Sequence, residues 1–138
     1  MSYYQEATEH LRVKTYEIAQ TLNAPLIWQQ SRQEPPDARI WLYGTVSWLT
    51  ANVISVGIRS TTYTGLYRIQ LLVQQGDGSD DINFYADQVT EVFEAGYDAP
   101  LGGSGQLTVF PGGVAQTFQD RGREAVNIDF TAQIQECR

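Results

Sequence analysis

The chain has 138 residues, with 9 Lys and Arg against 16 Asp and Glu, which gives a formal net charge of -7. This length is typical of one domain, so we expect a single domain over residues 1–138 whose core needs neither disulfides nor a metal. The excess of acidic residues disfavours electrostatic binding to nucleic acid or to an anionic membrane surface.

The first predicted element is a helix from about Tyr4 to Asn23. Its charged residues lie off one apolar stripe, a pattern typical of an amphipathic helix. The residues of the stripe are Ala7, Leu11, Ile18 and Leu22. Leu26 to Trp28 then predicts a short strand. The polar stretch from Gln29 to Asp37 contains two prolines and predicts a surface loop.

The stretch from Arg39 to Leu49 alternates between apolar and other residues and predicts a strand with one buried face. Trp41 and Tyr43 lie on the opposite face, which therefore needs cover from a helix or from another subunit. Residues 50–64 predict a long hairpin arm. Residues 40–58 are uncharged and long enough to span a bilayer, but their frequent polar and β-branched residues favour a sheet.

The segment from Leu66 to Val73 alternates again and predicts a further strand, which the Gly-Asp-Gly turn at residues 76–78 ends. A second helix is predicted from Asp80 to Ala95, with Ser79 as its N-cap and Gly96 as its C-terminal stop. Its apolar residues follow the helical stripe: Ile82, Tyr85, Ala86, Val89 and Phe93.

The glycines and proline between Tyr97 and Gly105 predict a mobile loop. Strands are predicted at residues 107–110, 114–118 and 125–134, with turns at 111–113 and 120–122. The last strand alternates most regularly. Helix, strands, helix and strands in this order predict an α+β fold, a mostly antiparallel sheet packed with two helices.

The residues that could carry chemistry are few. One cysteine, Cys137, and one histidine, His10, exclude a Cys/His zinc site and a disulfide framework, and His10 sits in a charged helical segment without a partner. The acidic run at residues 77–81 departs from the calcium-loop pattern and is better explained as a helix cap. Residues 102–105 lack the lysine and following helix of a phosphate loop. We expect no enzyme, no metal and no cofactor; a small carboxylate hydrolase is the alternative from another class.

The order of elements resembles the tail terminator proteins of long-tailed bacteriophages over nearly the whole chain. The similarity lies in the N-terminal helix leading into Leu26-Ile27-Trp28, the Pro35-Pro36 loop, and the strand ending in residues 65–73. It continues through the Gly-Asp-Gly turn, the second helix and the late hairpin strands. Residues 50–64 and 97–105 depart from the compact members of the family.

The resemblance implies a non-enzymatic virion protein, assembled in the host cytoplasm, that forms a ring, expected to be a hexamer, at the neck. Its partners would be further copies of itself, the tail tube protein, and the head-tail connector or a head completion protein, with no membrane. Double-stranded DNA would pass through without specific binding. The alternative function is a head completion or connector-docking neck protein.

Two sets of surface residues are candidates for these roles. Uncharged and aromatic residues make poor solvent surfaces, so the interface candidates are Trp41, Tyr43, Trp48, Val53, Ile54, Val56, Ile58 and Tyr63. An acidic channel lining would repel phosphates, so the lumen or surface candidates are Asp77, Asp80, Asp81, Asp87, Glu91 and Glu94.

Overall fold

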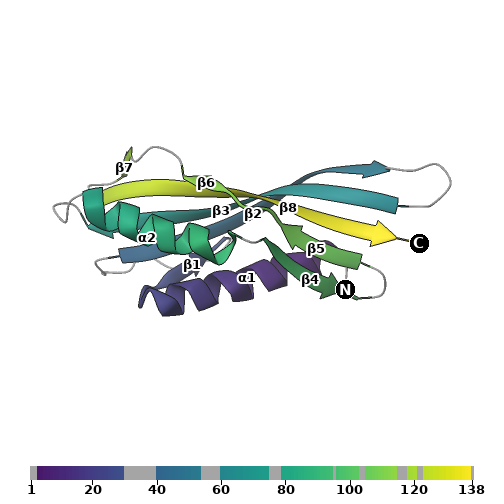
Figure 1. The fold of residues 1–138 in the computed structure, drawn as a ribbon, viewed down its shortest axis with the longest axis horizontal. Helices are drawn as coiled ribbons and strands as arrows, with labels where there is room; N and C mark the ends of the chain where they lie inside the picture. The colour runs from purple at the N-terminus through teal and green to yellow at the C-terminus, as the bar shows by residue number, and fades with distance from the viewer. Residues whose placement is uncertain are drawn as a thin grey trace.

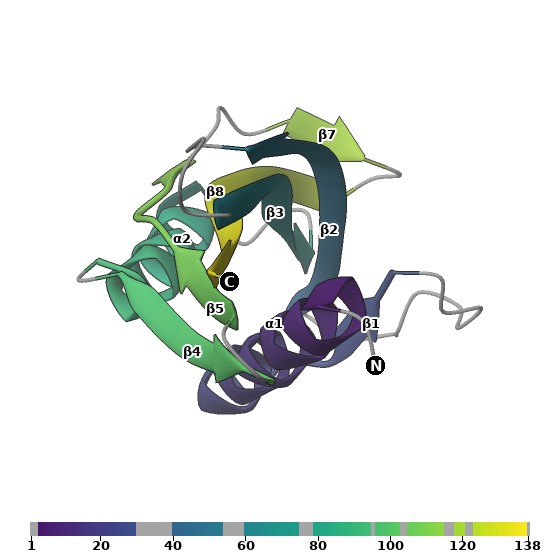
Figure 2. The same cartoon turned by 90° about the vertical axis from the view of Figure 1, so that its right-hand side faces the viewer.

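A curled, mostly antiparallel sheet runs the length of the molecule, and two helices lie along its concave side (Figures 1 and 2). The computed structural model describes residues 3–29, 40–53, 60–74, 79–94, 96–102, 105–114, 118–120 and 123–137. The α+β fold predicted from the sequence is confirmed.

Three long strands form the centre of the sheet: β2 (Ile40–Val53), β3 (Ser60–Gln74) and β8 (Arg123–Cys137). The sheet order is β1-β2-β3-β8-β5-β4, with β1 (Leu26–Trp28) parallel to β2 at one edge. The other side is built from β5 (Gly105–Val109) and β4 (Tyr97–Leu101). Two short strands, β6 (Gly113–Val114) and β7 (Phe118–Asp120), also pair with β8. Residues 30–37 of the predicted surface loop, 76–78 of the Gly-Asp-Gly turn, and 115–117 and 121–122 near the last turn lie outside the described residues.

The predicted alternation along the two central strands is confirmed. From residue 67 in β3 and from residue 126 in β8, every second residue is buried on the concave face, with at most 1% of its surface exposed: Tyr67, Ile69, Leu71, Val73, Val126, Ile128, Phe130, Ala132 and Ile134. The intervening residues are more exposed on the convex face, except for the buried residues Thr62, Leu72 and Ala125. A period of two therefore fixes the register, because a one-residue slip would turn every apolar side chain outward.

Both predicted helices are present and pack through their apolar stripes. Helix α1 spans Tyr3–Thr21 and helix α2 spans Ser79–Val92. Asn23 has a φ of 55°, a left-handed conformation that ends α1 two residues before the predicted end. Gly96, with a φ of 84°, follows α2 as predicted, and its N–H donates to the carbonyl of Phe93 at 2.9 Å. No described helix is both long and apolar enough to cross a bilayer.

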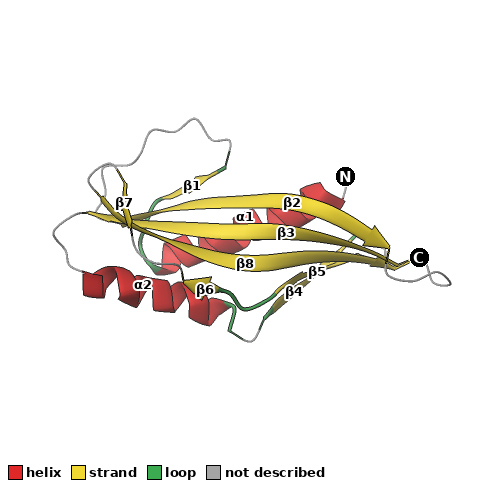
Figure 3. Ribbon diagram, turned by 90° about the horizontal axis from the view of Figure 1, so that it is seen from above, coloured by secondary structure: helices red, strands yellow, loops and turns green. Residues whose placement is uncertain are grey.

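The predicted hairpin arm is formed by the distal halves of β2 and β3, which project past the helices beside the end of β8 (Figure 3). A register shift between Trp48 and Thr50 marks an irregularity in β2, and pairing continues to Val53 opposite Thr61. The tip of the arm at residues 54–59 lies outside the described residues. Ile54, Val56 and Ile58 fall there, so they remain candidates only.

The prediction of a mobile loop between Tyr97 and Gly105 is wrong. Residues 97–101 form β4, which pairs with β5 and places Ala99 and Leu101 in the core. Pro100 obscured this strand in the sequence, because proline cannot donate to a ladder and is tolerated only at a sheet edge, where β4 lies. Gly102 follows as a turn, and residues 103–104 lie outside the described part.

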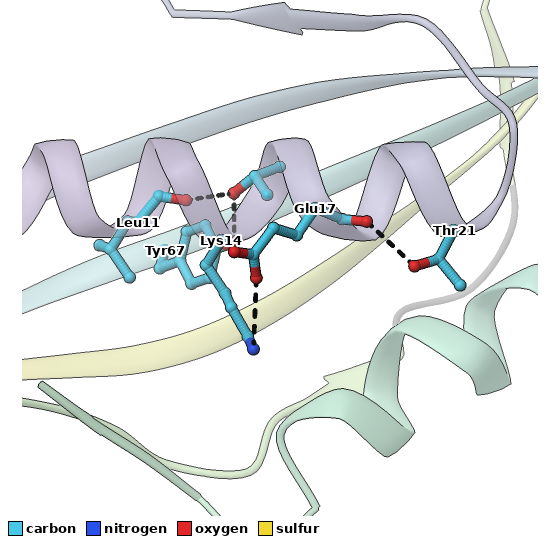
Figure 4. Close-up of polar contacts among 6 residues, drawn as sticks. Leu11, Lys14, Glu17, Thr21 and Tyr67 are labelled. Carbon is cyan, nitrogen blue, oxygen red and sulfur yellow. Dashed lines mark hydrogen bonds and ion pairs between the residues drawn. The ribbon is translucent and has the colours of Figure 1, made fainter.

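One buried hydroxyl pair joins α1 to the centre of the sheet. Tyr67 of β3 has no exposed surface, and its hydroxyl is hydrogen-bonded to the hydroxyl of Thr15 on α1. Thr15 also donates to the carbonyl of Leu11 at 2.6 Å (Figure 4). Burial raises the pKa of the Tyr67 hydroxyl, so the neutral form that makes this bond is retained.

Gly65 offers a test of the packing at the base of the arm. A Cβ at this position would lie 2.5 Å from Cε3 of Trp48, whereas a Cβ at Gly113 would meet no atom within 4 Å. We expect Gly65→Ala to lower the free energy of unfolding by about 1–3 kcal/mol through overpacking, as measured by urea denaturation. The control Gly113→Ala should change it by less than about 0.5 kcal/mol, and equal effects of the two variants would show that Trp48 does not constrain Gly65.

Thr15 offers a test of the hydroxyl pair. Thr15→Val leaves the Tyr67 hydroxyl buried without this partner, so we expect a loss of about 1–3 kcal/mol in the free energy of unfolding. The matched control is Thr21→Val, because the Thr21 hydroxyl also donates to a carbonyl one turn earlier, Glu17 at 3.0 Å, but is exposed. Tyr67→Phe should cost less than Thr15→Val, since Thr15 keeps its bond to Leu11; the reverse order would refute this account.

Candidate assembly surfaces

The predicted interface residues Trp48 and Tyr63 lie together at the base of the arm, on the concave side. The indole N–H of Trp48 donates to the hydroxyl of Thr8 at 3.1 Å. The ring of Tyr4 contacts both residues, with centroids 5.8 Å from Trp48 and 5.0 Å from Tyr63. These contacts tie the first turns of α1 to the arm, and Trp48 and Tyr63 are half-buried within the chain.

The predicted interface residues Trp41 and Tyr43 lie on the opposite, convex face. Trp41 is only 7% exposed and packs with Ile27, Leu72 and Ala125, and Tyr43 packs against this cluster. The expected cover by a helix or another subunit is therefore not required for Trp41, because parallel strand β1 places Ile27 beside it in the same sheet. Its indole N–H is buried and has no hydrogen-bond partner among the described residues.

The candidate interface set is thus divided between two faces instead of forming one patch. The backbone of Val53 lies at the described end of the arm. Whether any of these residues contacts another subunit stays a prediction.

Sequence reasoning missed a second group of apolar side chains, which the two helices expose to solvent. On α1, Val13 is 43% and Tyr16 is 53% exposed, and on α2, Phe84 is 58% and Val92 is 40% exposed. Each of them lies outside the apolar stripe that defined its helix, and that position was the available signal. Apolar side chains that form a contiguous exposed patch mark contact surfaces, so these residues are further candidates.

A shallow hollow of about 130 Å³ separates the two helices. Ile18 and Leu22 of α1 and Val92 of α2 contribute its apolar walls. Lys14 lies beside it, 3.8 Å from Glu17 and 5.1 Å from the ring centre of Tyr97. Burial raises the pKa of Tyr97, and the nearby Glu17 raises it further.

The predicted acidic candidates are partly described. Asp87 and Glu91 on α2 and Glu94 just after it are exposed, and they border a hollow of about 270 Å³ with Pro111 and Gly112. Asp77 and the side chains of Asp80 and Asp81 lie outside the described part. Within the described part, no three His, Cys, Asp or Glu side chains are placed to hold a metal ion.

Charge is distributed unevenly along the chain. Residues 69–120 contain eight of the sixteen acidic residues and none of the nine Lys and Arg residues. The described basic side chains lie elsewhere and are paired with carboxylates: Arg12 with Glu9, Lys14 with Glu17, and Arg68 with Asp129. The elements α2, β4 and β5 therefore contribute acidic residues and no basic residue, and Lys14 of α1 is a described cation beside them.

The middle of the convex face carries a polar ladder that is satisfied within the chain. The guanidinium of Arg68 donates two hydrogen bonds of 2.6 and 3.2 Å to the carboxylate of Asp129, and these bonds raise the pKa of the guanidinium. Next to it, Gln70 donates to Asn127 at 3.0 Å. These cross-strand pairs fix β3 against β8 and leave the charge of Arg68 compensated.

Comparison with known proteins bears on the identity of the chain. A family profile described as phage tail terminator protein matches residues 8–130. A solved structure matches with a TM-score of 0.70 and 21% sequence identity, over 96% of this chain and 96% of that chain. At this identity the likeness shows the fold alone. No curated protein matches the chain.

Proposed function

The chain belongs to the phage tail terminator family, and we propose that it closes the end of the tail tube as a ring of identical copies. The family is structural, which makes the protein a virion component, and we propose that it acts without catalysing a reaction. The observation that carries the proposal is the match of the family profile over residues 8–130, which includes α1 from Thr8 onward, all of α2 and most of the sheet.

The asymmetry of the subunit supports a ring. A ring needs a heterologous contact, in which two different surfaces of the subunit meet. The arm of β2 and β3 lies at one end of the molecule, while α2 with its exposed Phe84 lies towards the other (Figure 1). Two distinct surfaces, one uncharged and one acidic and apolar, suit head-to-tail contacts better than a self-complementary patch does. We take six copies as the expected number.

The ring would act through geometry. One face would cover the last tube subunits and stop further addition, and the other would offer a docking surface to the head-tail connector or a head completion protein in the neck. The exposed carboxylates on and just after α2, Asp87, Glu91 and Glu94, suit a protein beside passing DNA, because they would not retain its phosphates.

The decisive experiment measures mass and tube capping together. Light scattering and negative-stain microscopy of the purified protein, alone and with tail tubes, should reveal rings in solution or at tube ends. A protein that remained monomeric in both conditions would refute the proposal. Rings that did not bind tubes but bound connectors would favour the alternative of a connector-docking neck protein.

Phe84 provides a test of the subunit contact. Phe84→Ser removes an apolar side chain that is 58% exposed, so we expect the free energy of unfolding to change by less than about 0.5 kcal/mol while ring assembly weakens severalfold. Analytical ultracentrifugation across a concentration series measures the assembly. The control Asn83→Ser alters an exposed polar residue of the same helix and should assemble as the wild type does. Unchanged assembly of Phe84→Ser would exclude Phe84 from the contact.

The charge distribution gives a further expectation. We expect negligible binding of the ring to duplex DNA at physiological salt, with any dissociation constant weaker than about 0.1 mM, because the acidic surface offers no counterion release. Fluorescence anisotropy with a labelled duplex at low and physiological salt measures this. Tight binding that falls steeply with salt would contradict an acidic conduit.

A further inference from the structure

The first two turns of α1, residues 3–8, lie between the two margins of the curled sheet. The strand order places β4 at one margin, and β2 forms the other margin wherever β1 does not cover it, because β1 pairs only with residues 42–44. Figure 2 shows α1 between β4 and β2, on the open side of the curl. At this end of the molecule the helix therefore takes the place that a closing strand would have in a barrel.

One side of these turns contacts the base of the arm. The ring of Tyr4 packs against Trp48 of β2 and Tyr63 of β3, and the hydroxyl of Thr8 accepts the hydrogen bond from the indole N–H of Trp48. Tyr4 and Thr8 are four residues apart, so they lie on the same side of the helix. Together they hold the helix against β2 and β3.

The other side of the same turns contacts the β4–β5 hairpin. The carboxylate of Glu6 accepts a hydrogen bond of 2.7 Å from the N–H of Gly102, directly after β4. The ring of Tyr3 lies against Gly105 at the start of β5, where a Cβ would overlap it. Tyr3 and Glu6 are three residues apart and share this second side of the helix. The two contacts hold the helix against the end of the hairpin.

These contacts complete a circuit of elements. From β2 the hydrogen-bonded order passes through β3, β8 and β5 to β4, and residues 3–8 lead back from β4 to β2. Residues 132–136 of β8 pair with β5 on one side and with residues 61–65 of β3 on the other. Because the circuit is closed, neither margin of the sheet can move far without breaking contacts of the helix. Such a chain of packed and hydrogen-bonded groups can carry coupling between two distant segments.

The contacts of residues 3–8 are also easier to break than those of the core. The hydrogen bond between Glu6 and Gly102 is exposed, and Tyr4 is 37% exposed. Among residues 3–8 only Ala7 is buried, and its side chain is a methyl group. Leu11 and Thr15, further along α1, have no exposed surface. Segments with few buried contacts open at a lower free energy than the core does, so these turns can detach while the rest of α1 stays packed.

We propose that residues 3–8 are a strap that couples the arm to the β4–β5 hairpin, so that releasing the helix from one of them loosens the other. The strap sets the curvature of the sheet at this end and with it the direction in which the arm projects. Coupling of this kind is reciprocal, because a free energy shared by two sites acts equally in both directions. It is a property of one subunit and does not depend on the proposed ring.

The strap has a consequence for assembly that rests on the proposed function. In a ring that uses the arm as a contact surface, a group that binds the hairpin and displaces Glu6 would change the strength of that contact. The hairpin and the arm would then report on each other although they lie on different strands.

The test uses amide hydrogen exchange in Glu6→Ala, which removes the acceptor for Gly102 and leaves every contact with the arm in place. The amides of residues 61–64 in the arm should exchange at least about fivefold faster than in the wild type, because one hydrogen bond of the circuit is lost. The amides of Ile69 and Leu71, in the core part of the same strand, should exchange at the wild-type rate. Exchange is compared at a concentration at which variant and wild type have the same mass in light scattering.

Two control variants isolate the contact. Glu6→Gln keeps an acceptor oxygen and should restore the exchange of the arm. Glu9→Ala removes a carboxylate that bonds Arg12 within the same helix, so it should leave the arm unchanged. Faster exchange confined to Gly102 and the hairpin would show that the two sides of the strap are independent and would refute the coupling. Equal acceleration of residues 61–64 and of the core amides would show that Glu6 merely stabilises the whole fold, which also overturns the proposal.

Thr8→Val tests the coupling from the side of the arm and decides the question if Glu6→Ala does not fold. It removes the acceptor of the Trp48 indole, so the amide of Gly102 should exchange at least about fivefold faster while the core amides stay unchanged. Thr8→Ser keeps the hydroxyl and should restore the wild-type rate. Unchanged exchange of Gly102 in folded Thr8→Val would refute the coupling. A wild-type protein that formed no ring would refute the proposed function and leave the exchange result standing.

Discussion

The fold depends on the burial of Tyr67 at the point where four elements meet. Its ring, on the central strand β3, contacts Phe93 after α2 at 5.8 Å and Phe130 of β8 at 5.5 Å, and its hydroxyl reaches Thr15 of α1. Phe93 and Phe130 are themselves 4.6 Å apart, which closes an aromatic triangle. A phenol without exposed surface requires a partner for its hydroxyl, so the position of α1 over the sheet is set by a polar requirement as well as by apolar packing.

That constraint leaves the arm to be held by other contacts. Beyond Tyr67 the sheet passes Gly65, where the absence of a side chain lets Trp48 lie across β3. Trp48 then binds Thr8 and contacts Tyr4, so the first turns of α1 support the arm from the concave side. Pairing of β3 with β8 as far as Ser60 and Cys137 adds a third strand. The arm is therefore an extension of the sheet and not a separate hairpin.

Sequence patterns predicted the elements whose side chains alternate or recur without interruption. β8 and α2 are examples, because the apolar residues on their predicted faces reach the core, while Phe84 and Val92 of α2 lie off that stripe. β4 could not be recognised, since Pro100 and the following glycines masked the alternation of Ala99 and Leu101. The burial of Trp41 depends on β1 lying parallel beside β2, and a single sequence does not show which strands are neighbours. The exposed Phe84 was not predicted, because the apolar stripe identifies only the residues on the buried side of the helix. The sequence predicted the candidate interface residues. Their division between the two faces of the sheet follows from the strand pairing, which the sequence does not show.

Edge protection and charge both differ between the two margins of the sheet. The acidic elements α2, β4 and β5 include the β4 edge, which is blocked because Pro100 has no N–H to donate and Glu6 occupies the Gly102 amide. The other margin contains the open part of β2, from Ser47 to Val53, where no described strand pairs with its outer side and no residue is charged. A carboxylate-rich surface resists nonspecific association, whereas an open, uncharged edge favours it. The two edges lie on opposite sides of the sheet order, so the subunit presents its blocked edge and its open edge in different directions.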